Sequence, residues 1–276
     1  MRKSRVGPLF VYEWGEPEAP ALLYWDGLGG TGLHANEIGP LLVRDHGLRV
    51  VAPDAPGHGR SPALAPDEFR PSRLAALAAD LLTELGVERA AFLGFSWGGR
   101  VGCWFSARFP ERTTALALVE GGHHASLPPT GLKAAIEEAR AEREGDTFAS
   151  WDEFIASESK SLRRWTPALE EAHRGVMQEE SGRVAPILSA EALGAINQGS
   201  RLEPLAEAYP TLAASAVPVL LVVASGIETE AVKRFRAALP DARLESIPDG
   251  VHDLVSFAPE EVARLVGEFV TAQPPP

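Results

Sequence analysis

The sequence contains almost no cysteine, no long apolar run and no block of basic residues. Its one cysteine in 276 residues, Cys103, excludes an internal disulfide and is typical of a reducing cytoplasm. No apolar run approaches the roughly 18 residues of a membrane-spanning helix, and no apolar segment typical of a secretory signal follows the basic residues 1–5. The net charge of −12 argues against nucleic acid or an anionic membrane as partner, because no basic block offsets it. We therefore expect a cytoplasmic protein with neither kind of partner, and its oligomeric state stays open.

The most informative stretch is the pentapeptide Gly94-Phe95-Ser96-Trp97-Gly98, which has the form G-x-S-x-G. An apolar run at residues 90–93 predicts a short buried strand before it, and residues 100–109 predict a helix after it that ends at Pro110. A serine at so sharp a turn has strained backbone, and a Cβ at either glycine position would collide with a neighbouring strand or helix. This context predicts a nucleophile elbow, with the Ser96 hydroxyl above the carboxyl edge of a sheet.

Apolar strands alternate with amphipathic helices on both sides of this stretch. Residues 21–25, 48–52, 116–119, 217–223 and 243–247 read as strands, and helices are expected at 35–46, 74–85 and 259–271. Such alternation predicts the α/β class, with a mostly parallel central sheet flanked by helices. Residues 123–209 show helical periodicity without a convincing strand, so we expect them to form a helical cap inserted between core segments 1–122 and 210–276. The alternative is that they form an outer layer of a single domain.

Several histidines follow predicted strands and are therefore candidates for the site. His252 lies beyond the last strand, at the edge where ligands of α/β proteins gather, and is the best candidate for the base that Ser96 needs; the alternative is a surface histidine. His58 and the pair His123-His124 are expected to line a substrate pocket. We expect no metal site, because adjacent histidines without a carboxylate at ligand spacing are weak evidence for one. No cofactor is expected, because neither glycine-rich loop has the spacing of a dinucleotide or phosphate-binding loop.

Together these motifs resemble the α/β-hydrolase family. The resemblance covers roughly residues 8–272 and rests on four features: the Ser96 elbow, the glycine-rich loop at residues 26–32, the loop at residues 54–61, and the late His252 followed by residues 259–262. By this resemblance the oxyanion hole consists of the backbone N–H groups of Leu28 and Trp97. Where the family usually has His-Gly at the start of the oxyanion loop, this chain has Asp26-Gly27. A carboxylate there would oppose a developing oxyanion unless it turned away to cap loop N–H groups.

The acid that orients His252 is the second departure from the family pattern. Family members commonly carry an aspartate shortly after the strand at residues 217–223, and residues 224–230 contain none. Some relatives place the acid after the strand that follows the elbow helix, where this chain has Glu120. We favour Glu120 over Glu228, because a lone carboxylate at the end of an apolar strand is costly to bury without a partner. Glu228 is explained by the favourable effect of a helix dipole on a negative charge in its first turn.

These features predict a serine hydrolase that cleaves a small carboxylic ester or lactone through an acyl-enzyme on Ser96. His252 would act as the base and Glu120 would orient it. Trp97, Trp104, Trp151 and Trp165 suggest an apolar or aromatic acyl pocket, although core packing explains at least half of them. Two alternatives stay open. One is acyl transfer or carbon–carbon bond hydrolysis by the same triad, and the other is a ligand-binding protein with little turnover.

Overall fold

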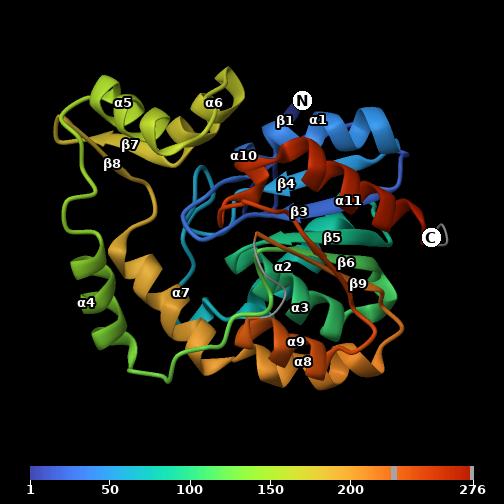
Figure 1. Ribbon diagram of the computed structural model, residues 1–276. Coiled ribbons are helices and arrows are strands. Elements are labelled where there is room, and N and C mark those ends of the chain that lie inside the picture. Colours follow the sequence, from blue (N-terminus) through green and yellow to red (C-terminus); the bar gives the residue numbers. More distant parts are fainter. Residues whose placement is uncertain (225–228, 274–276) are drawn as a thin grey trace.

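An eight-stranded sheet runs through the middle of the molecule (Figure 1). The structure, a computed structural model, describes residues 1–224 and 229–273. In the order β1-β2-β4-β3-β5-β6-β9-β10, the first two strands are antiparallel to their neighbours and the other six are parallel. The strands are β1 (Arg2–Val6), β2 (Leu9–Trp14), β3 (Ala21–Trp25), β4 (Arg49–Pro53), β5 (Ala90–Phe95), β6 (Thr113–Val119), β9 (Val219–Val223) and β10 (Arg243–Ser246). This mostly parallel sheet confirms the predicted α/β class.

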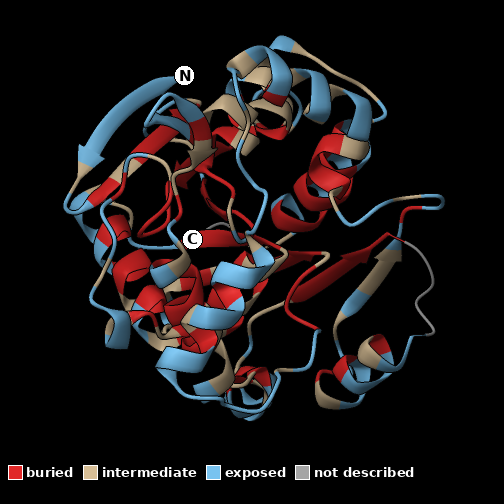
Figure 2. Cartoon of the chain, turned by 90° about the vertical axis from the view of Figure 1, so that its left-hand side faces the viewer, coloured by how far each residue is buried: buried red, intermediate tan, exposed pale blue. Residues whose placement is uncertain are grey.

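Helices cover both faces of the sheet, which is why its central strands are apolar throughout. Every residue of β3, β4, β5 and β9 is buried, as expected for parallel strands between two helical layers. One layer contains α1 (Ala35–His46), α10 (Leu254–Phe257) and α11 (Pro259–Thr271). The other contains α2 (Pro71–Glu84), α3 (Trp97–Arg108), α8 (Leu205–Ala214) and α9 (Glu230–Ala238). Figure 2 shows the buried residues concentrated in the sheet and on the helix faces turned toward it. Cys103 is fully buried in α3.

The chain between β6 and α8 lies to one side of the sheet (Figure 1). It contains α4 (Leu132–Glu142), α5 (Trp151–Ser161), α6 (Pro167–Gly175), the strands β7 (Met177–Glu180) and β8 (Arg183–Pro186), and α7 (Ala190–Leu202). The prediction of helices alone was wrong here, because β7 and β8 pair as an antiparallel hairpin. Its two-residue turn is Ser181-Gly182, with φ of 51° and 76°. Turns with two positive φ values match the twist of paired strands, and a glycine at the second position was the overlooked signal.

The division into a core and an inserted cap stays a prediction. α4 and α7 pack closely at Gly194 of α7, where a Cβ would lie only 2.6 Å from the Cα of Ile136 in α4. The expected boundary between cap and core at residue 210 falls within α8. Leu205 and Leu212 of this helix belong to the core between the sheet and the layer that contains α2, α3 and α9. Among the residues described, none of the helices combines the length and apolar composition needed to cross a lipid bilayer.

Candidate active site

Ser96 sits on the sharp turn between β5 and α3, as its sequence context predicts. Its φ of 50° and ψ of −117° are unfavourable for a residue with a side chain. A Cβ on Gly94 would lie 2.6 Å from the carbonyl oxygen of Gly98, and a Cβ on Gly98 would collide with the carbonyl oxygen of Trp25. The glycines at positions 94 and 98 therefore allow α3 to pack directly against β5 and β3.

The structure brings Ser96, His252 and Glu120 into one hydrogen-bonded row. The Ser96 Oγ lies 2.8 Å from the His252 Nε2, and the His252 Nδ1 lies 3.2 Å from the Glu120 Oε2. The three residues follow β5, β10 and β6, so parallel strands carry them to the same edge of the sheet. The other oxygen of Glu120, Oε1, accepts a hydrogen bond of 2.5 Å from the Ala224 N–H. Glu120 has a positive φ of 46°, a second strained residue at this edge.

The partners of His252 set the tautomer of its imidazole. An ionised carboxylate only accepts hydrogen bonds, so the Nδ1 of His252 must donate to Glu120 and its Nε2 is left to accept from the Ser96 hydroxyl. The hydrogen bond and the negative charge of Glu120 raise the pKa of His252, although partial burial opposes them. Burial tends to raise the pKa of Glu120, but hydrogen bonds from His252 and Ala224 outweigh it and lower the pKa. The other candidate acid, Glu228, lies outside the described residues.

Asp26 makes contacts that explain how a carboxylate is tolerated at the start of the glycine-rich loop. It is almost fully buried, at 4% exposure. One oxygen accepts from the Tyr24 hydroxyl at 2.7 Å, and the other lies 2.7 Å from the His34 Nδ1. Burial favours neutral His34, but the charge and hydrogen bond of Asp26 prevail and raise the pKa of His34 to about 9. A charged His34 therefore balances Asp26 at neutral pH. These partners are side chains, and not the loop N–H groups that the sequence suggested.

The predicted oxyanion loop lies against the elbow. A Cβ on Gly27 would lie 3.3 Å from the Ser96 Cβ, so the backbone that leads into Leu28 passes directly beside the serine. Trp97 is the first residue of α3, a position whose N–H has no partner within its own helix. Among the described residues, no hydrogen bond from the N–H of Leu28 or Trp97 is found.

His58 holds this loop in place, a role that sequence reasoning missed. His58 is 1% exposed, so almost none of its surface is accessible to solvent. Its Nε2 accepts a hydrogen bond of 3.1 Å from the Gly29 N–H, while its Nδ1 lies 3.0 Å from the Pro56 carbonyl oxygen. Burial lowers the pKa of His58 to about 4, so the ring is neutral and can accept at Nε2. The ring also stacks on Trp97 at a centroid distance of 5.7 Å, joining the two segments predicted to form the oxyanion hole.

An apolar cavity of about 490 Å³ lies beside His123 and His124. This agrees with the prediction that these histidines line a pocket. Its other lining residues include Leu205, Tyr209 and Phe235. None of the four tryptophans proposed for an acyl pocket lines this cavity. Trp97 and Trp104 pack against the core on the side of the sheet that α2, α3, α8 and α9 cover. Trp151 packs on Phe154, and Trp165 packs on His173.

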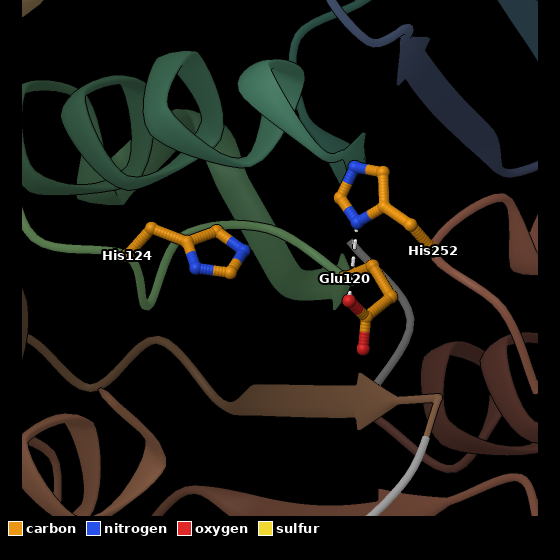
Figure 3. Close-up of side chains that lie close together, drawn as sticks. All are labelled: Glu120, His124 and His252. Carbon is orange, nitrogen blue, oxygen red and sulfur yellow. Dashed lines mark hydrogen bonds and ion pairs between the residues drawn. The ribbon is translucent and has the colours of Figure 1, made fainter. Parts of the chain in front are cut away.

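His124 points toward the pair formed by Glu120 and His252 (Figure 3). One ligand atom from each of these residues lies within 4.8 Å of the other two. The adjacent histidines therefore do have a carboxylate nearby, contrary to the expectation from sequence. Glu120 is four residues before His124 in sequence, and the fold adds a second imidazole from a loop 128 residues further along.

The sheet, the elbow and the row of serine, histidine and carboxylate define an α/β protein of the hydrolase type. The chain belongs to the α/β hydrolase fold family, which it matches over residues 20–259. It is 35% identical over 128 residues to the 2-hydroxy-6-oxo-6-phenylhexa-2,4-dienoate hydrolase of Comamonas testosteroni. The match spans 44% of this chain and 44% of that enzyme, less than half the length of each.

Solved structures resemble nearly the whole chain, and two of them serve as examples. The thioesterase domain from the curacin biosynthetic pathway has a TM-score of 0.77 at 21% identity, over 96% of this chain and 98% of that one. The enol-lactonase from Burkholderia xenovorans has a TM-score of 0.71 at 21% identity, over 98% of this chain and 100% of that one. At such low identity this likeness establishes the fold alone.

Proposed function

We propose that this protein is a serine hydrolase that cleaves a small carboxylic ester or lactone. The observation that carries the proposal is the continuous row in which Ser96 Oγ, His252 and Glu120 are joined at 2.8 Å and 3.2 Å. A serine hydroxyl becomes a strong nucleophile only when a base removes its proton, and the base works best when a third group fixes its tautomer. This row provides both functions.

In the proposed reaction the Ser96 Oγ attacks the acyl carbon while its proton moves to the His252 Nε2. The carbonyl oxygen becomes an oxyanion, which the N–H groups of Leu28 and Trp97 would stabilise. His252 then gives the proton to the leaving alcohol, and an acyl group remains on Ser96. Water attacks this ester while giving a proton to the same nitrogen, and that proton then passes to the Ser96 Oγ as the acid product leaves. Glu120 stabilises the imidazolium of His252 in both steps.

A cavity next to the row, which Ser96, Glu120 and His252 do not themselves line, favours a substrate with an apolar part. The cavity of about 490 Å³ beside His124 has mostly apolar walls, including Leu205 and Phe235. Its one aromatic hydroxyl, that of Tyr209, donates a 2.6 Å hydrogen bond to the Gly122 carbonyl oxygen and is therefore already paired. An alkyl or aryl group would gain roughly 25 cal/mol for each Å² of apolar surface that it buries there.

A second candidate reaction is hydrolysis of a carbon–carbon bond next to a ketone. The relative from Comamonas testosteroni is named as a hydrolase of an oxo-dienoate. That compound contains no ester or amide bond, so its hydrolysis must cleave a carbon–carbon bond. Product analysis with such a keto acid, compared with an ester of similar size, would separate the two reactions.

The first test is labelling with a fluorophosphonate probe, followed by mass spectrometry of the modified peptide. We expect rapid labelling of Ser96 in the wild type and none in Ser96→Ala. Ser157→Ala removes an exposed serine of α5 and is the matched control, in which labelling should be unchanged. If folded wild-type protein is not labelled and also cleaves no member of an ester and lactone panel, the hydrolase proposal is wrong. A ligand-binding protein would then explain the fold better.

A further inference from the structure

Next to the predicted catalytic acid Glu120 and base His252 lies the side chain of His124, which has no part in the proposed reaction. Glu120, His124 and His252 lie close together (Figure 3), and one potential ligand atom of each lies within 4.8 Å of those of the other two. Two imidazoles and a carboxylate are a common ligand set for Zn²⁺. These three residues come from two separate segments. Glu120 and His124 lie in the segment that follows β6, and His252 lies in the loop after β10.

The geometry is close to that of a tetrahedral zinc site. Bonds of about 2.1 Å at tetrahedral angles place neighbouring ligand atoms about 3.4 Å apart. The Nδ1 of His252 and the Oε2 of Glu120 are already 3.2 Å apart. The remaining adjustment falls on the exposed His124, whose ring packs on the His123 ring at a centroid distance of 3.9 Å. The fourth position would face solvent, because the His252 side chain is 56% exposed, and would take a water molecule.

The backbone holds one oxygen of Glu120, and the other faces the imidazole with which it would share an ion. Its Oε1 is engaged by the Ala224 N–H at 2.5 Å, which holds the carboxylate in position. Its Oε2 has the His252 Nδ1 as partner, and an ion would insert between these two atoms. The net charge of −12 also favours the approach of a cation.

We propose that Glu120, His124 and His252 form an inhibitory site for Zn²⁺ or a similar transition-metal ion. The ion would bind the lone pair of the His252 Nδ1, so the proton of the neutral imidazole moves to the Nε2. A protonated Nε2 cannot accept the Ser96 proton, and Glu120 no longer orients the ring. The ion binds reversibly, forms no covalent bond with substrate and changes no oxidation state. The inhibition rests on the proposed function, whereas the binding does not.

Binding is tested by calorimetry with ZnCl₂ on chelator-treated protein. Ser96→Ala should bind one equivalent, as the wild type does, because it retains all three ligands. His124→Ala should bind at least about tenfold more weakly, since even outer-shell partners of a metal ligand are worth 10–100-fold in affinity. His123→Gln removes the neighbouring imidazole, whose Nδ1 lies 3.1 Å from the Gly121 carbonyl oxygen, and serves as the matched control. Thermal melts without metal verify that each variant is folded.

Inhibition is tested by dividing the activity of each protein in Zn²⁺ by its own activity in excess chelator. At ten times the measured Kd, occupancy by mass action predicts about an elevenfold loss in the wild type, fully reversed by chelator. The same concentration should cause less than about a twofold loss in His124→Ala. The site is refuted if folded Ser96→Ala binds no Zn²⁺, or if His123→Gln rather than His124→Ala abolishes binding. Stoichiometric, His124-dependent binding in a protein without hydrolase activity would overturn the proposed function and leave the metal site intact.

Discussion

Replacing Glu120 by glutamine tests how His252 is oriented, because the amide has nearly the same shape as the carboxylate. In the wild type the Oε1 of Glu120 accepts from the Ala224 N–H at 2.5 Å. The amide oxygen of the introduced glutamine would keep that bond, which turns its NH₂ group toward the His252 Nδ1. The Nδ1 must then accept, so the ring carries its proton on Nε2 and cannot take one from Ser96.

The wrong tautomer should lower kcat about 10³- to 10⁴-fold with little change in KM, as removal of the orienting acid does in other serine triads. This loss corresponds to about 4–5 kcal/mol of transition-state stabilisation. The pH profile gives a second measure. Glu120 raises the pKa of His252, and catalysis needs the neutral ring. In the wild type, kcat/KM should therefore fall with a midpoint above pH 6.5 as the pH is lowered. In Glu120→Gln the midpoint should move to lower pH.

The assay is steady-state hydrolysis of the best ester or lactone from the panel, between pH 5 and pH 9. Glu228→Gln is the comparison variant, since Glu228 was the competing candidate for the acid, and its kcat should change less than about threefold. A small effect of Glu120→Gln together with a large effect of Glu228→Gln would refute the assignment of Glu120. Equal and negligible effects would mean that neither residue orients His252.

Two further predictions concern the framework around the site. The pKa of His34 is raised to about 9 by Asp26, so its contribution to stability is complete below about pH 6.5 and is lost as the pH rises through about 9. In urea unfolding, His34→Gln should cost about 3 kcal/mol more at pH 6 than at pH 10, whereas a pH-independent cost would contradict the ion pair. A Cβ on Gly98 would strike the backbone of Trp25, so Gly98→Ala should lower the free energy of unfolding by about 3 kcal/mol or more and abolish probe labelling. Gly47→Ala, at a φ of 63° with open space around it, should cost only about 1–2 kcal/mol and leave labelling intact; equal effects of the two substitutions would argue against close packing at the elbow.

Much of the sheet and the elbow could be predicted because local patterns encode them. The expected helix at residues 35–46 coincides with α1, and the apolar run that ends in the elbow is β5. Continuous apolar runs arise when strands are covered on both faces, and the glycine spacing around Ser96 arises from contacts within a few residues. The hairpin of β7 and β8 was missed because its strands are only four residues long and lack the alternating apolar pattern.

The amino-acid sequence by itself determined the α/β class, the position of Ser96 and the short list of residues at the carboxyl edge of the sheet. Only the tertiary structure decided which of them meet. Glu120 contacts His252 across 132 residues, Asp26 pairs with His34, and His58 supports Gly29. The physical reason is that a strand's apolar pattern specifies where the chain emerges from the sheet. The direction of the emerging side chain depends instead on backbone torsions and on partners that come from other strands, as the positive φ of Glu120 and its bond to Ala224 illustrate.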